Sequence, residues 1–383
     1  MTLDHGLVLL RKQVADWAVD FRALALELDA DPDVIHQHLD LPAVRYLATM
    51  IVPAEWGAEP VRVAGRRFYG MAALERAVVM EELACADAGM LLASPGPAMC
   101  GVLVDLLADD AQKSWFYGRI LADPQWTFFA LTEPDRGSDA TALQTRLTPD
   151  GVLDGAKRYV GNASRASMGA VFARTRPGPL GITAVLVDTA APGYSATPLD
   201  MLGLRGARIS AITLSGMEIP PDRVLGRHLS QTQRGMLACV RTFNRLRPAV
   251  AAMALGIARA AYEYVLANRS NPSKDEQCRL DRLRRRIDGT RELIHLAAAT
   301  VDARADAGHL ASAAKARACR LAEDTTIEAC GFLGPGARLE HPLLDKLTRD
   351  ARGVEFMEGT GNMQKLNLFQ GLLQGKLDNR SQS

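Results

Sequence analysis

Residues 126–139 read WTFFALTEPDRGSD. The stretch from Trp126 to Leu131 is aromatic or apolar except for Thr127, a composition typical of a buried strand. The polar loop that follows carries hydroxyls and small residues, which can direct side-chain and backbone donors at a phosphate or a heterocycle. A plain turn is the alternative interpretation of this loop. In either case the stretch predicts a strand that ends in an irregular loop.

Similar runs continue on the C-terminal side of this strand. Short β-branched or aromatic segments, separated by Gly, Pro, Asp and Asn, occupy Tyr159-Val160, Ala170 to Arg174, Ile182 to Val187 and Ile209 to Leu214. Such segments are typical of strands joined by turns. We therefore predict a small β domain over residues 123–234.

Helical spacing of apolar residues is found on both sides of the β region. Leu7, Leu10, Val14 and Phe21 follow this spacing before it, and an Ala-rich stripe that includes Met253 and Ile257 follows it after Gly235. The predicted fold class is therefore α+β. It has a helical domain over residues 1–122, the β domain over 123–234 and a second helical domain over 235–383.

A second segment suggests chemistry. Residues 356–362 read FMEGTGN, which puts the carboxyl group of Glu358 among apolar residues just before a flexible Gly-Thr-Gly turn. Burial raises the pKa of a carboxyl group and makes it a usable base near neutral pH. A helix cap is the alternative interpretation.

Composition excludes several classes of protein. Lys and Arg number 45 against 44 for Asp and Glu, so no overall field exists to hold nucleic acid. No run reaches the roughly 18 apolar residues that a membrane span needs. The six cysteines are scattered without zinc or redox spacing, and no export signal is recognisable. We expect free thiols, a cytoplasmic protein and no membrane partner.

Several common catalytic and binding patterns are missing from the sequence. It has no P-loop, HExxH, G-x-S-x-G or EF-hand pattern. His36 and His38 lie two residues apart without a third ligand, so no metal site is expected. The glycine-rich stretch Gly331 to Gly336 follows a helical segment, which indicates a helix C-terminal turn rather than a Rossmann turn.

Taken together, these motifs resemble the acyl-CoA dehydrogenase family, and the resemblance covers nearly the whole chain. The motifs that carry it, in chain order, are Glu81 to Ala84 with Ala86 to Ala88, the two segments quoted above, Gly155 to Asn162, Gly203 to Arg205, Ile219-Pro220, Val224 to Gly226, Phe243 to Ala252 and Arg349 to Ala351. The family fold is a helical domain, a β domain and a C-terminal four-helix bundle. This order matches the one predicted from the periodicity.

The resemblance implies FAD-dependent α,β-dehydrogenation of an acyl thioester, carried by CoA or by an acyl carrier protein. Glu358 would abstract the α-proton while flavin N5 accepts the β-hydride. Its backbone N–H and a ribityl hydroxyl of FAD would polarise the thioester carbonyl. In some branches the base precedes the arginine equivalent to Arg247; that residue is Leu246 here, so the role falls to Glu358 alone.

The resemblance also assigns binding residues. The cofactor contacts would be Leu131, Thr132, Gly137, Ser138, Tyr159, Val160, Gly161, Thr360 and Asn362, with Arg269 reaching the FAD of a neighbouring subunit. The substrate contacts would be Ser138, Asn244, Arg247 and Gly359. Tyr159 replaces a tryptophan of the family, Gly161 replaces a threonine, and the loop after Arg269 is short. These departures favour a specialised biosynthetic enzyme.

Two other functions remain open on the same sequence. One is a flavin-dependent oxidase or monooxygenase, although a hydroxylase has no need of an α-proton base. The other is a helical assembly protein that has lost catalysis. The family also implies an electron-transfer flavoprotein or another electron acceptor as a partner, and a homodimer or homotetramer.

Overall fold

The computed structural model describes residues 3–304 and 307–374. The outer ends of the first and third predicted domains, residues 1–2 and 375–383, lie outside the described residues. The helices are α1 (His5–Ala30), α2 (Pro42–Thr49), α3 (Ala73–Ala93), α4 (Ala98–Leu107), α5 (Asp110–Ala122), α6 (Met236–Asn268), α7 (Lys274–Ala303), α8 (Gly308–Leu333), α9 (Ala337–Glu340), α10 (Pro342–Glu355) and α11 (Gly361–Leu373). The strands are β1 (Val61–Val63), β2 (Arg66–Phe68), β3 (Thr127–Ala130), β4 (Arg146–Leu147), β5 (Val152–Val160), β6 (Met168–Arg174), β7 (Ile182–Asp188), β8 (Tyr194–Pro198) and β9 (Ser210–Glu218).

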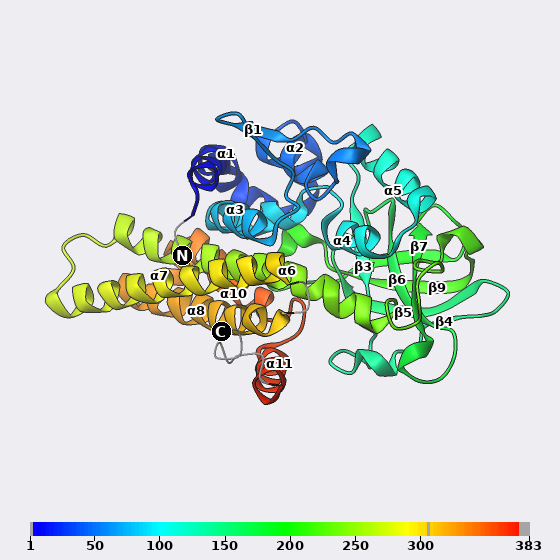
Figure 1. Cartoon of the computed structure of the whole chain (residues 1–383). Coiled ribbons are helices and arrows are strands. Elements are labelled where there is room, and N and C mark those ends of the chain that lie inside the picture. Colours follow the sequence, from blue (N-terminus) through cyan, green and yellow to red (C-terminus); the bar gives the residue numbers. More distant parts are fainter. Residues whose placement is uncertain (1–2, 305–306, 375–383) are drawn as a thin grey trace, which may run out of the picture.

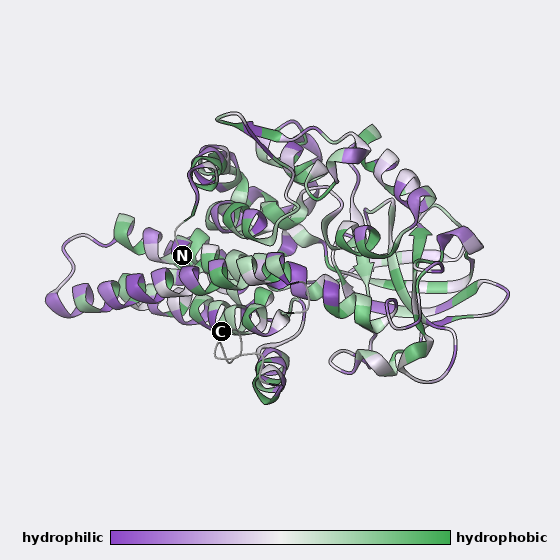
Figure 2. Cartoon of the chain, in the orientation of Figure 1, coloured by the Kyte–Doolittle hydropathy of each residue, from purple (hydrophilic) through white to green (hydrophobic). Residues whose placement is uncertain are grey.

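The middle of the chain forms a mixed sheet, which lies at the right in Figure 1. Its strand order is β3-β6-β4-β5-β9-β8, and β7 pairs with β6. β3 runs parallel to β6, whereas β5, β9 and β8 are antiparallel. The strands are mostly hydrophobic in Figure 2, as expected for a sheet covered by other elements. The register of β5 against β9 shifts between Lys157 and Val160, which bends the strand just before Gly161.

The C-terminal region forms a helix bundle. α6, α7, α8 and α10 pack together, and α11 packs on α8. α6 extends from the β domain into the helical part of the molecule (Figure 1). It is long and apolar enough to cross a membrane, but it is largely buried between α3 and α8. The length and apolarity of α6 are therefore those of a core helix.

The N-terminal region differs from the prediction at one place. It is helical except for a short hairpin of β1 and β2, which the sequence did not predict. The hairpin turns at Ala64 and Gly65, which both have positive φ, the backbone that a tight two-residue hairpin needs. Strands of three residues leave too short a pattern to detect, because two of the residues in β2 are exposed arginines.

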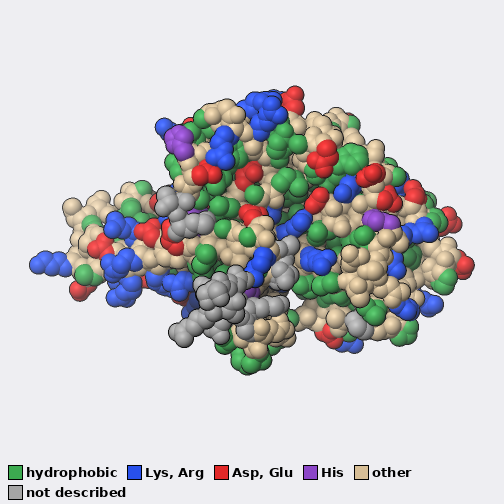
Figure 3. Space-filling view, viewed as in Figure 1, with side chains coloured by type: hydrophobic (Ala, Val, Ile, Leu, Met, Phe, Trp, Pro, Cys, Tyr) green, Lys and Arg blue, Asp and Glu red, His purple; other side chains and the backbone are tan. Residues whose placement is uncertain are grey.

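Other sequence-based expectations are confirmed. All six cysteines are free. α8 ends at Leu333 and is followed by Gly334 with positive φ, as predicted for a helix C-terminal turn. Beyond these expectations, α7 has exposed arginines opposite the buried Leu280, Leu283 and Ile287, and Lys and Arg side chains gather over the end of α7 and α8 in Figure 3.

A buried charge cluster joins three parts of the chain. Lys346 on α10 pairs with Asp87 on α3 and, at 2.6 Å, with Asp350 one turn along α10. Asp350 also accepts a hydrogen bond of 2.6 Å from the backbone N–H of Leu204, which lies between β8 and β9. Asp87 has extended φ and ψ and kinks α3 at this point. The cluster therefore fixes the β domain and α3 against α10.

Replacing Lys346 with methionine should destabilise the fold strongly, because two carboxylates would remain buried without a cation. We expect the free energy of unfolding to fall by about 3–5 kcal/mol, measured by denaturant unfolding. The matched control is Arg320→Met, which breaks the Arg320–Asp324 pair, whose arginine is 73% exposed, and should cost less than about 1 kcal/mol. Equal effects of the two variants would contradict this role for the cluster.

Candidate active site

The loop after β3 is fastened by a buried ion pair. Lys157 Nζ donates to the carbonyl oxygen of Leu131 and to Glu133 Oε1, both at 3.0 Å. The Glu133 carboxylate also accepts from the backbone N–H groups of Gln144 (2.6 Å) and Thr145 (2.8 Å). Burial lowers the pKa of Lys157 to about 8. These bonds fix Leu131 and Thr132 at the end of the strand and leave the distal part of the loop, with the predicted residues Gly137 and Ser138, exposed.

Tyr159 lies beside this loop. The backbone N–H of Arg158 donates to the carbonyl oxygen of Thr132 (2.9 Å), which places the end of β5 next to the loop. Tyr159 has φ of 61° and is 58% exposed, whereas Val160 is buried. This backbone holds the Tyr159 ring at the surface, where the Arg158 guanidinium lies 5.4 Å from it. The structure thus brings Leu131, Thr132 and residues 159–161 together.

α6 connects the sheet to the second predicted segment. The ring of Phe243 lies 5.8 Å from that of Phe129 on β3, and the Arg247 guanidinium lies 5.5 Å from the Phe243 ring. Arg247 Nη1 donates to Asn244 Oδ1 at 3.0 Å, and both residues are buried. A side chain at Gly308 would collide with the Asn244 amide. Asn244 and Arg247 are therefore held as a pair, and Arg247 Nε has no hydrogen-bond partner among the described residues.

Glu358 is on a tight turn between α10 and α11. Glu358 has φ of 51° and Gly359 has φ of 95°. Gln364 Nε2 donates to the carbonyl oxygens of both residues at 2.9 Å. Lys315 Nζ donates to the carbonyl oxygens of Gly359 (2.6 Å) and Glu355 (2.7 Å). In the part of the chain that the structure describes, the backbone N–H groups of Glu358 and Gly359 donate no hydrogen bond. Within the described residues, the carbonyl oxygens of Glu358 and Gly359 are therefore satisfied and the N–H groups of these two residues are free.

The carboxyl group of Glu358 is desolvated. Its Oε2 atom is shielded from solvent and has no hydrogen-bond partner within residues 3–304 and 307–374. Burial raises the pKa of Glu358 to about 8, although the positive charges of Arg247, Lys315 and Arg76 oppose the rise. A carboxyl group in this state can take up a proton near neutral pH.

Cys239 on α6 lies between the two halves of the site, the end of β3 and the Glu358 turn. Its thiol is buried, and the charged groups near it are Lys157 on the sheet side and Arg247 and Glu358 on the bundle side. Together with the Phe129–Phe243 contact, this places the end of β3 and the Glu358 turn around the same stretch of α6. The two sequence segments that suggested chemistry thus face one region of the molecule.

Three predicted cofactor residues lie at the edge of this region or far from it. Thr360 precedes α11, and its side chain makes no capping hydrogen bond, while Asn362 is exposed in the first turn of the helix. Arg269 forms an ion pair of 2.9 Å with Glu276. It follows Arg247 by 22 residues, about 33 Å along a straight helix. Within one chain Arg269 is therefore remote from Glu358.

Sequence reasoning missed the buried residues that hold the Glu358 turn and the loop after β3. Lys315, Gln364 and Lys157 are fully buried, and none was assigned to the site. For Lys315 a signal existed, because it shares a helical stripe with the buried Ala311 and Ala318, four residues before it and three after it. A lysine on such a stripe needs a buried acceptor. Gln364 offered no comparable signal.

No group of three or more His, Cys, Asp or Glu side chains able to hold a metal ion is found among the described residues. The charged groups near Glu358 are the cations Arg247, Lys315 and Arg76. Arg76 donates to backbone carbonyl oxygens. A buried carboxyl group among these cations suits proton transfer.

Comparison with known proteins assigns this arrangement of helical, β and helical parts to a class of flavin oxidoreductases. Residues 128–217 match the acyl-CoA dehydrogenase middle domain, and residues 233–373 match the C-terminal domain of the same family. The two matches cover more than half of the chain. The chain therefore belongs to the acyl-CoA dehydrogenase family.

Individual relatives are more distant. The 3-(aryl)acrylate reductase of Clostridium sporogenes is 28% identical over 97% of this chain and 99% of its own length. The structure of the prolyl acyl carrier protein oxidase AnaB has a TM-score of 0.83 at 21% identity, over 97% of this chain and 100% of that chain. The structure of PigA with FAD and proline has a TM-score of 0.83 at 19% identity, and the match covers 97% of this chain and 98% of that chain. The solved structures support the fold.

Proposed function

We propose that this protein is an FAD-dependent dehydrogenase that introduces an α,β double bond into an acyl thioester carried by CoA or by a carrier protein. The observation that carries the proposal is the Glu358 turn. It combines a shielded carboxyl group, whose pKa burial raises to about 8, with a backbone N–H that has no partner in the described chain. A proton acceptor and a donor for the carbonyl oxygen are the two groups that α-proton removal from a thioester requires.

The residues around the end of β3 fit a flavin. The exposed ring of Tyr159 lies beside Thr132, and Val160 and Gly161 complete that wall. Thr360, whose side chain makes no capping hydrogen bond to the described residues, lies at the N-terminus of α11, where a dinucleotide phosphate would be favoured. PigA, a protein of the same fold, has been solved with FAD. When bound, FAD would accept the β-hydrogen together with its two electrons.

The chain itself supplies the acid–base and positioning chemistry. Glu358 takes the α-proton, and its own N–H donates to the thioester carbonyl oxygen as negative charge develops there. Lys315 and Gln364 hold the carbonyls of the turn, which turns the N–H groups toward the opposite side. Asn244, Arg247, Ser138 and Gly359 would contact the thioester and its arm. Leu246 is buried and carries no proton-accepting group, so Glu358 has no competitor there.

Several finer points belong to the same proposal. The enzyme would pass electrons to an electron-transfer flavoprotein or a similar acceptor, work in the cytoplasm and act as a homodimer or homotetramer in which Arg269 meets the FAD of a neighbouring copy. An oxidase would share the same first half-reaction and differ only in the electron acceptor. The specific observation in its favour is the similarity in fold to AnaB, an oxidase of a carrier-bound substrate.

The pH dependence follows from the protonation state of Glu358. The base works only when ionised, so kcat/KM should be low below pH 7 and rise through a pKa of about 8. Stopped-flow reduction of bound flavin at limiting thioester concentration, from pH 6 to 9.5, measures this profile. A rate that falls over this range would contradict the assignment of Glu358 as the base.

The function is tested by the visible spectrum of the purified protein, followed by anaerobic addition of CoA, carrier-protein and pantetheine thioesters. Bleaching of a flavin band by a thioester supports α,β-dehydrogenation, the half-reaction that a dehydrogenase shares with an oxidase acting on the same thioester. A flavin band that no thioester bleaches favours an oxidase or monooxygenase with another substrate. Protein that binds no flavin would favour the assembly role.

A further inference from the structure

The positive charge of this nearly neutral chain is unevenly distributed. Between Asp222 and Glu263 the sequence has seven arginines and no acidic residue. The stretch 173–187, which contains Arg174 and Arg176, also has no acidic residue. The first stretch contains the loop that precedes α6, and the second contains the loop that precedes β7. The loop before β7 borders the first turn of α6. Arg223, Arg245 and Arg259 pair with carboxylates, so the cations that can meet an anionic partner are among the other arginines of these stretches.

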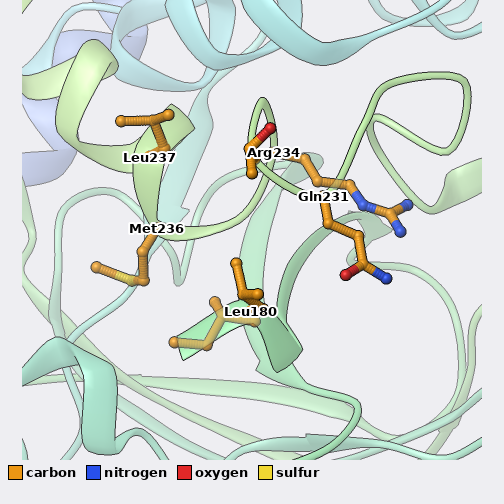
Figure 4. Close-up of a pocket in the computed structure, with 7 residues that line it drawn as sticks. Leu180, Gln231, Arg234, Met236 and Leu237 are labelled. Carbon is orange, nitrogen blue, oxygen red and sulfur yellow. The ribbon is translucent and has the colours of Figure 1, made fainter. Parts of the chain in front are cut away.

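The two loops meet at a small cavity, shown in Figure 4. The cavity has a volume of about 220 Å³ and is lined by Leu180, Ile182, Gln231, Thr232, Arg234, Met236 and Leu237. Arg176 Nη2 donates to Gln231 Oε1 at 2.7 Å, which joins the loop before β7 to the loop before α6. The cavity therefore marks the junction of the β domain with the start of α6.

Cationic and apolar side chains surround this cavity. Arg176, Arg234 and Arg241 have no carboxylate within 4.0 Å in the described chain, whereas Arg245 nearby pairs with Asp105 at 2.9 Å. Leu180, Leu237 and Val240 are 56%, 44% and 42% exposed. We call these six residues (Arg176, Leu180, Arg234, Leu237, Val240 and Arg241) the α6 entrance surface. The surface combines unpaired guanidinium groups with exposed apolar side chains, as protein interfaces do.

This surface is connected to the candidate active site. Leu237, Arg241 and Asn244 are four and three residues apart, so they share one face of α6. Leu237 lies about 15 Å from Arg247 along the helix. On the other side, Arg174 Nε donates to the carbonyl oxygen of Leu143 at 2.9 Å and holds the loop that carries Ser138. An extended arm that starts at the surface would thus run along α6 to Glu358.

We propose that the α6 entrance surface docks the acidic face of a carrier protein, whose phosphopantetheine arm delivers the acyl thioester along α6 to Glu358. This inference rests on the proposed function and names its partner. Charge complementarity selects the occupant, because guanidinium groups without carboxylate partners, interspersed with exposed apolar side chains, call for a partner face on which acidic and apolar side chains alternate. The nucleotide of CoA would use the small cavity and one or two cations. It would leave the exposed Leu180 and Val240 unexplained.

The test compares one acyl group on three carriers: an acidic acyl carrier protein, CoA and pantetheine alone. The acyl group is the one that reduces the flavin fastest as its pantetheine thioester. The variant Arg176→Glu/Arg241→Glu should lower kcat/KM for the carrier-protein thioester about tenfold or more, and should change the other two less than about twofold. The matched control, Arg282→Glu/Arg285→Glu on the exposed face of α7, should leave all three rates unchanged.

The outcomes are distinguishable. A larger loss with the CoA thioester would assign the surface to the nucleotide, and no loss with any carrier would remove its role in docking; either result overturns the proposal. If the pantetheine thioester fails to reduce wild-type flavin, the proposed function fails. In that case, binding of the holo carrier protein, measured by fluorescence anisotropy at 50 and 300 mM salt, tests docking separately from catalysis. Binding that weakens with salt and is lost in the Arg176→Glu/Arg241→Glu variant supports docking at the α6 entrance surface. Any other result contradicts docking there.

Discussion

Glu358→Gln should retain the fold and the bound flavin and lose flavin reduction by a factor of about 100 or more, because the side chain keeps its shape but can no longer accept a proton. The residue is partly buried and its Oε2 atom has no partner in the described chain, so a neutral amide costs the fold little. Anaerobic stopped-flow reduction by a thioester at saturating concentration measures the loss directly.

The matched control for this variant is Glu355→Gln, one turn before Glu358. Glu355 Oε1 accepts a hydrogen bond of 2.6 Å from the backbone N–H of Gly361, and the amide oxygen of glutamine can replace it. The control should therefore change the rate only a few-fold. If Glu358→Gln reduces flavin as fast as wild type, or if both variants lose activity equally, Glu358 is not the base.

The arrangement of the chain was predictable because its periodicity changes along the sequence. Apolar residues of helical spacing flank a region of short β-branched runs, and the structure has helices, a sheet and helices in that order. The hairpin of β1 and β2 was missed because two of its residues are exposed arginines and its strands are three residues long. The division at residues 122 and 234 stays a prediction, although α5 ends at Ala122 and α6 begins at Met236.

The site was predictable only in part. The Glu358 segment stands out locally, because a carboxylate among apolar residues before a Gly-Thr-Gly turn is unusual by itself. The contacts that orient this turn come from Lys315, 43 residues earlier, and from Gln364 on the next helix. Such contacts depend on how α8, α10 and α11 pack, and one sequence does not give helix packing. The roles assigned to the individual FAD and substrate residues stay predictions.

Lys315 should act as a positioning residue, and its replacement tests whether the turn needs its hydrogen bonds, its charge or both. Lys315→Met removes the donor to the Gly359 and Glu355 carbonyls and the cation that holds down the pKa of Glu358. We expect kcat to fall about 10- to 100-fold, because a base displaced by about 1 Å loses that much. The apparent pKa of the rate should also move above 8.

Two further variants separate the contributions of Lys315. Gln364→Met removes hydrogen bonds from the same turn without changing its charge, so it should lower kcat and leave the pH profile in place. Lys315→Gln keeps amide donors and removes the cation, so it should move the profile upward and recover part of kcat. Stopped-flow rates from pH 6 to 10 measure both quantities. A purely structural lysine would lower the content of folded protein in all lysine variants and leave the profile of the remaining enzyme unchanged. A shift shared by both lysine variants and absent from Gln364→Met therefore isolates the effect of the buried cation on Glu358.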